Sequence, residues 1–122
     1  MTDRGDTLLE ARATCLRAAE ALAGTPGGEP GKAAERLRAV ADQLEKTAGL
    51  FFVKTKASAS FLVTLGRRAR SLEDALAQVA LPEGAARGDE DWQAFLDELD
   101  AVENEANVLH AKATTVQQMM IT

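Results

Sequence analysis

The chain has 122 residues, a length typical of one small domain, and 46% of them are hydrophobic, which excludes a disordered composition. Lys and Arg total 14 against 19 Asp and Glu, so the net charge is −5 and a basic surface over the whole domain is excluded. Cys15 is the only cysteine, so no disulfide forms within the chain and we expect a reducing compartment.

The first predicted helix spans residues 6–23. Asp6 is a suitable N-cap, and Gly24 opens a segment rich in glycine and proline that stops the helix. No long run in the chain alternates apolar and polar residues, which is the pattern of a half-buried strand. The sequence therefore predicts an all-α protein.

Residues 32–80 carry the most regular apolar pattern of the chain. The pattern alternates spacings of four and three residues through Leu37, Ala41, Leu44, Ala48, Phe51, Thr55, Ser58, Leu62, Leu65, Ala69, Leu72, Leu76 and Val79. This heptad spacing is typical of the seam of a packed helix. Because its phase continues across Gly49 and Gly66, it predicts one continuous helix, about 70 Å long at ~1.5 Å per residue.

The third predicted helix spans residues 89–120. It follows a second segment of helix breakers, and Asp89 or Asp91 can cap its first turn. Its seam has the same three-four spacing, through Trp92, Phe95, Leu99, Val102, Ala106, Leu109, Ala113, Val116 and Met120. Both outer helices then lie antiparallel along the long central helix, as two helical hairpins in a coiled-coil-like rod.

Such a rod leaves apolar side chains in water, because residues 50–65 are apolar on more than one face. The sequence therefore predicts a dimer with a four-helix cross-section. The alternative is a compact monomeric four-helix bundle, with the middle segment folded back near Gly49 or Gly66. The residues predicted to form the protein interface are Leu50, Phe51, Phe52, Val53, Phe61, Leu62 and Val63, with Met119 and Met120 as a second apolar element.

Basic residues gather in the middle of the chain, where residues 49–71 contain no acid. These residues are Lys54, Lys56, Arg67, Arg68 and Arg70. One interpretation is a site for nucleic acid or another anion. The favoured interpretation pairs the three arginines with the acids of the third helix, namely Asp97, Glu98, Asp100 and Glu103.

The residue types needed for catalysis or metal binding do not occur in workable patterns. His110 is the only histidine, and Asn107 stands where a di-iron bundle would need a glutamate three residues earlier. Cys15 has no histidine nearby and lies on an apolar face, which indicates a buried thiol. We therefore predict no catalytic, cofactor or metal site, and no enzyme.

The functional hypothesis is a non-enzymatic interaction or assembly protein acting through an exposed apolar helix face. Its partner is a second copy, as a homodimer or higher oligomer, or another helical protein. One alternative is a nucleic-acid-binding accessory subunit, and a lesser one is a protein that coats lipid or granule surfaces. The sequence contains neither a signal peptide nor a transmembrane stretch, and its composition suggests a bacterial, cytoplasmic protein.

Overall fold

The structure, a computed structural model, describes residues 4–24, 28–79 and 88–121. This part of the chain holds four α-helices and no strand, so the all-α prediction is confirmed. The helices are α1 (Arg4–Ala23), α2 (Gly28–Ala48), α3 (Ala59–Val79) and α4 (Asp89–Ile121). Two short 3-10 helices, η1 (Phe51–Lys54) and η2 (Lys56–Ser58), lie between α2 and α3.

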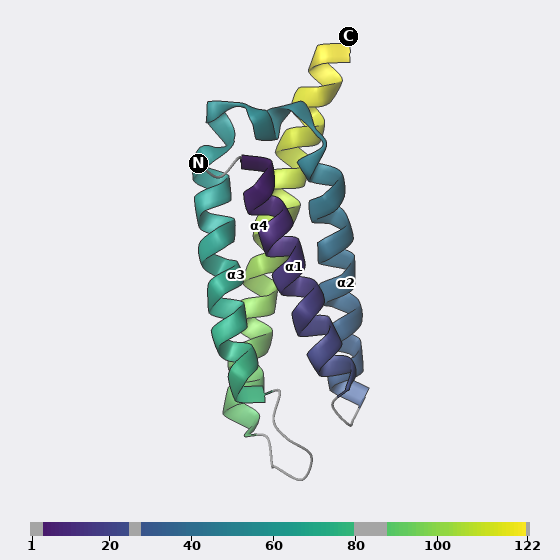
Figure 1. The fold of residues 1–122 in the computed structure, drawn as a ribbon, viewed down its shortest axis with the longest axis vertical. Helices are drawn as coiled ribbons and strands as arrows, with labels where there is room; N and C mark the ends of the chain where they lie inside the picture. The colour runs from purple at the N-terminus through teal and green to yellow at the C-terminus, as the bar shows by residue number, and fades with distance from the viewer. Residues whose placement is uncertain (1–3, 25–27, 80–87, 122) are drawn as a thin grey trace.

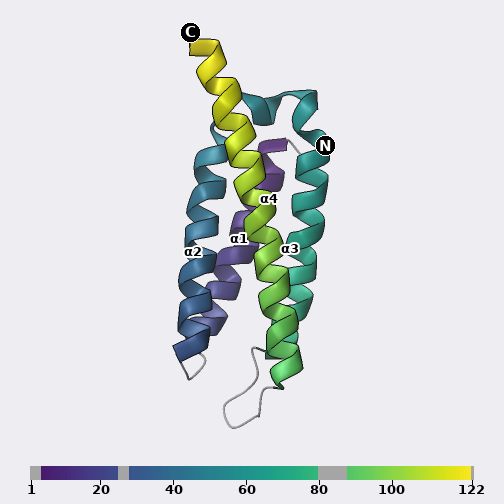
Figure 2. The same cartoon turned by 180° about the vertical axis from the view of Figure 1, so that it is seen from behind.

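The four helices form an elongated bundle of two antiparallel hairpins (Figure 1). One hairpin is α1 with α2, and the other is α3 with α4. Between the hairpins, α1 packs against α3 and α2 packs against α4. Seen from behind, α4 covers the side opposite α1, so α2 and α3 occupy diagonal corners (Figure 2).

The prediction of one continuous helix over residues 32–80 is wrong. Residues 49–58, here called the crossover, leave α2 and cross the end of the bundle to its diagonal neighbour α3. Leu50 and Thr55 adopt extended backbone, with ψ of 148° and 158°, which ends helical hydrogen bonding. The fold-back near Gly49, weighed as the alternative, describes this chain, whereas Gly66 lies within α3.

The crossover is stabilised by the apolar side chains that it buries at the end of the bundle. Phe52 is 3% exposed and Val53 is fully buried, and a straight helix would leave both in water. Burial of a large apolar side chain is worth about 1.5–3 kcal/mol, enough to offset the helical hydrogen bonds lost at a turn. Among the seam positions of the crossover, Ser58 is buried but Phe51 is 46% exposed, so the heptad pattern does not hold through this segment.

Most predicted seam positions outside the crossover are buried in one continuous core. The seam of α4 is buried from Trp92 to Ala113, and α2 contributes Leu37, Ala41 and Leu44. The single chain therefore supplies a four-helix cross-section by itself, and the rod two helices thick is wrong. Dimerisation is no longer needed to build the core, and it stays a prediction.

Candidate interaction surface at the crossover end

The structure divides the predicted interface residues into three groups. Phe52, Val53 and Leu62 are buried, so the prediction that these three form an exposed surface is wrong. Leu50 and Phe61 are half-buried against the core, and the Phe61 ring lies edge-on to Phe52 with their centroids 5.9 Å apart. The residues that stay exposed are Phe51 (46%), Val63 (61%), Met119 (72%) and Met120 (53%).

Hydrogen bonds fix the crossover against its own backbone and against α4. The buried Ser58 hydroxyl lies 2.8 Å from the Thr55 carbonyl oxygen and 3.0 Å from that of Val53. The Thr55 hydroxyl donates to the Phe52 carbonyl over 2.7 Å. The Phe51 N–H donates to Oε1 of Gln117 on α4 over 3.3 Å, which ties the start of η1 to the last turns of that helix.

The C-terminal part of α4 extends beyond the crossover (Figures 1 and 2). This helix has 33 residues against 21 in α3, its antiparallel partner. Met119 and Met120 lie on this overhang, at the same end of the bundle as Phe51. These three exposed side chains are here called the end patch.

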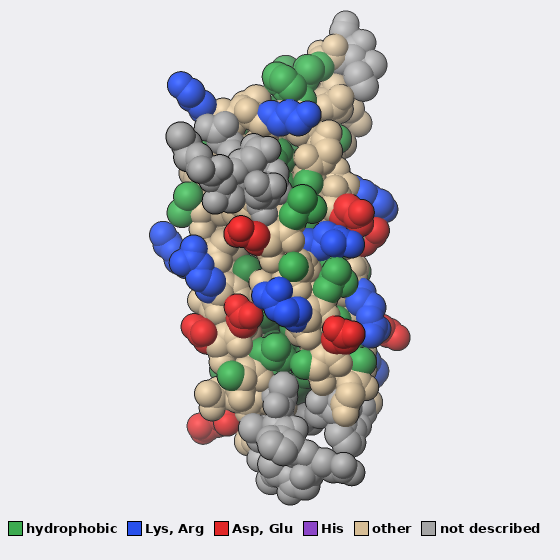
Figure 3. All heavy atoms as spheres, viewed as in Figure 1, with side chains coloured by type: hydrophobic (Ala, Val, Ile, Leu, Met, Phe, Trp, Pro, Cys, Tyr) green, Lys and Arg blue, Asp and Glu red, His purple; other side chains and the backbone are tan. Residues whose placement is uncertain are grey.

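The two segments that carry the end patch are basic, although the whole chain carries −5. Lys54 and Lys56 are exposed on the crossover, and Lys112 is exposed on α4. Neither residues 49–71 nor residues 106–122 include an acid. On the face shown in Figure 3, green hydrophobic and blue Lys or Arg side chains lie among tan atoms at the upper end, and no red side chain is visible there.

The favoured pairing of the α3 arginines with the α4 acids is wrong. Within the described residues, no ion pair joins Arg67, Arg68 or Arg70 to any acid. Asp100 and Glu103 face α2 instead, where the Arg36 guanidinium binds both, with 3.0 Å between Nε and Oε2 of Glu103. The side-chain hydrogen bond with Glu103 is the largest of the causes that raise the pKa of Arg36.

The other two of these α4 acids, Asp97 and Glu98, do not bind Arg36. Asp97 accepts a hydrogen bond from Gln93 on its own helix over 3.0 Å. Oε2 of Glu98 is buried and has no hydrogen-bond partner. The arginines of α3 therefore remain exposed to solvent, with their charges unpaired by this helix.

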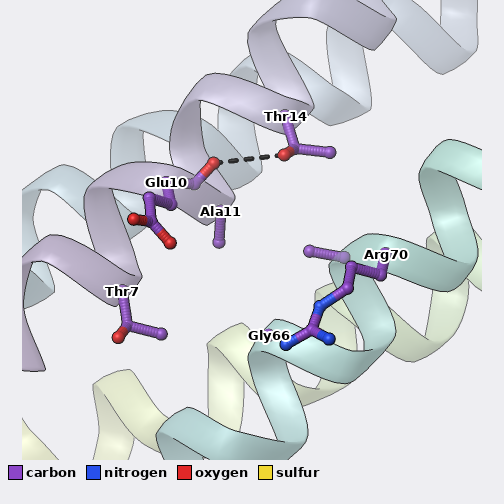
Figure 4. Close-up of a pocket in the computed structure, with 7 residues that line it drawn as sticks. Thr7, Glu10, Ala11, Thr14, Gly66 and Arg70 are labelled. Carbon is purple, nitrogen blue, oxygen red and sulfur yellow. Dashed lines mark hydrogen bonds between the residues drawn. The ribbon is translucent and has the colours of Figure 1, made fainter. Parts of the chain in front are cut away.

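A groove of about 230 Å³ lies between α1 and α3 (Figure 4). It is lined by Thr7, Glu10, Ala11, Thr14, Gly66, Ala69 and Arg70. The Thr14 hydroxyl donates a hydrogen bond to the Glu10 carbonyl oxygen over 3.1 Å. Arg70 extends back along α3 toward Gly66. No nucleophile in this lining lies against a base, so the groove offers no set of groups for covalent catalysis.

A second cavity, of about 250 Å³, opens between α2 and α4 at the end opposite the crossover. Its lining residues are Glu29, Lys32, Ala33, Arg36, Trp92 and Leu96, and we call it the tryptophan cavity. The Trp92 indole is 8% exposed and stacks on Phe95 with a centroid distance of 5.5 Å. The sequence did not predict this cavity, because its walls come from two helices whose contact no local pattern reveals.

The two reactive side chains of the chain are engaged within the fold. His110 Nδ1 lies 2.8 Å from Oγ1 of the buried Thr47, whose hydroxyl also lies 2.8 Å from the Gln43 carbonyl oxygen. Since one hydroxyl proton cannot serve both, Thr47 donates to Gln43 and accepts from His110 Nδ1–H. Burial raises the pKa of Cys15 to about 12, so this side chain is a neutral thiol near pH 7.

Comparisons with known proteins add no functional information. No family model matches the chain, and no significant similarity is found to a curated protein or to a solved structure. No helix among the described residues is both long enough and apolar enough to span a bilayer. No group of three metal-ligating side chains occurs among them either.

Proposed function

We propose that this protein is a non-enzymatic assembly protein that self-associates through the end patch. The observation that supports this is the exposure of three apolar side chains at one end of the bundle. Phe51, Met119 and Met120 are 46%, 72% and 53% exposed. Single exposed apolar residues are ordinary, whereas several at one place are typical of a partner surface. Methionine is well suited to such a surface because its flexible thioether adapts to an apolar partner.

Light scattering on a size-exclusion column tests this function. At high protein concentration we expect a mass at least twice 13.0 kDa, falling toward 13.0 kDa on dilution. The double variant Phe51→Asp/Met120→Asp should elute as a monomer with unchanged helicity, since both side chains are exposed. Val63→Asp is the matched control, because Val63 is 61% exposed but lies on α3 outside the end patch.

The opposite results would contradict the proposal. A wild-type protein that stays at 13.0 kDa at every concentration does not self-associate. An oligomer that dissociates with Val63→Asp but survives the double variant has its interface on α3 instead.

A nucleic-acid-binding accessory subunit is the second candidate function. It is favoured by the exposed positions of Arg67, Arg68 and Arg70 on α3, since no acid of the described residues pairs with them. Together with the exposed Lys54 and Lys56, they supply positive charge that attracts phosphates. The affinity for a labelled duplex should then fall steeply with salt, and Arg67→Gln/Arg68→Gln should reduce that slope. Arg38→Gln, an exposed position on α2, is the control, and a slope unaffected by the α3 variant would exclude this site.

A further inference from the structure

We propose that copies of this chain join head to tail, with the end patch of one copy seated in the tryptophan cavity of the next. This inference rests on the proposed self-association and adds the second surface of the contact. The two surfaces lie at opposite ends of the bundle, so a contact between them adds one copy after another along the long axis.

Shape and chemistry of the two surfaces fit each other. The end patch projects, because Met119 and Met120 lie on the part of α4 that extends past the crossover. The tryptophan cavity is concave, and the side chains of Trp92, Leu96 and Ala33 give it an apolar wall. Contact between a methionine sulfur and an aromatic ring is favourable.

Charge favours this pairing over a symmetric contact between two end patches. A symmetric contact would bring the exposed Lys56 of one copy toward the same lysine of the other, and residues 49–71 contain no acid. Near the tryptophan cavity, Asp100 and Glu103 already neutralise Arg36, and the charges of Glu29 and Lys32 in the lining offset each other. The exposed acids of the first α4 turn lie at the same end, so the surroundings of the cavity attract a basic partner surface.

A head-to-tail contact is heterologous, since each copy uses a different surface on its two neighbours. Each copy joined in this way still presents one free end patch and one free cavity. Association therefore does not stop at a dimer, and the mass should rise steadily with concentration. High salt should weaken it, because the charges around both surfaces are exposed.

Mixing two variants, each with one surface disabled, tests the head-to-tail contact. The patch variant is Phe51→Asp/Met120→Asp, and the cavity variant is Leu96→Lys, which places a charge in the apolar wall. Glu29→Lys is a second cavity variant at an exposed position, chosen in case Leu96→Lys fails to fold. We expect each variant alone to be monomeric, and an equal mixture of patch and cavity variants to form a dimer that grows no further.

Trp92 supplies a second, independent measurement because it is the only tryptophan. Its emission should shift when the wild-type protein associates and when the two variants are mixed. If the folded cavity variants associate like wild type while the patch variant is monomeric, the contact joins two end patches symmetrically. The head-to-tail contact is then wrong, whereas the proposed self-association is supported. If the wild-type protein is monomeric at every concentration, both the proposed self-association and the head-to-tail contact are wrong. If it associates without any change in Trp92 emission, only the head-to-tail contact is wrong.

Discussion

The guanidinium of Arg36 makes two ion pairs that link the two hairpins. It joins α2 to both Asp100 and Glu103 of α4, and these two acids lie one helical turn apart on one face. Removing it leaves two like charges side by side, so Arg36→Met should lower the free energy of unfolding by about 1 kcal/mol. Urea unfolding followed by circular dichroism measures this loss.

Arg38→Met is the matched control for Arg36. Arg38 is exposed on the same helix and makes no ion pair with a described residue, so its replacement should change stability by less than about 0.5 kcal/mol. The difference between the two variants should shrink at high salt, since both partners of Arg36 are partly exposed. Equal losses in the two variants would show that the ion pairs of Arg36 add no measurable stability.

His110 illustrates what residue types alone leave undecided. It has no catalytic neighbour along its own helix, and its hydrogen-bond partner Thr47 is 63 positions away in sequence. The arginines of α3 show how a pairing inferred within one hairpin can be wrong. Pairing them with the α4 acids was reasonable for an isolated hairpin, but α4 also faces α2, where Arg36 reaches Asp100 and Glu103.

At the level of the elements, the sequence predicted the outer helices closely. Residues 6–23 and 89–120 correspond to Arg4–Ala23 and Asp89–Ile121, because caps and breakers are local signals. The middle segment was predicted wrongly because a heptad phase records only which side of each helix is apolar. It does not distinguish one straight helix from two helices, α2 and α3, that fold back to face the same core.

The crossover formed at Gly49 and not at Gly66 for a physical reason. The residues after Gly49 include Phe52 and Val53, which close the end of the core, and Ser58 and Thr55, whose hydroxyls bind nearby carbonyls. Gly66 is followed by arginines that favour water, and its backbone continues α3. All three residues of the end patch, Phe51, Met119 and Met120, could be predicted from sequence, whereas the tryptophan cavity requires the contact of α2 with α4.

For the whole molecule, one continuous core built by both hairpins predicts a single cooperative unfolding transition. Leu8 is fully buried on α1, whereas Trp92 is on α4, the helix diagonal to α1. Leu8→Ala should cost about 2–5 kcal/mol, and it should lower the urea midpoint equally by Trp92 emission and by circular dichroism. The tryptophan senses the loss because neither hairpin can keep its inner apolar face buried without the other.

The neighbouring Leu9 provides the control for this last prediction. Leu9 is 46% exposed, so Leu9→Ala should shift the midpoint little, although the same atoms are removed from the same helix. A helical signal that falls before the Trp92 emission changes in Leu8→Ala would show that α1 detaches while the remaining helices stay folded. Such independence would contradict a core shared by four helices, because Leu8 belongs to the same buried cluster as Phe95 and Leu99.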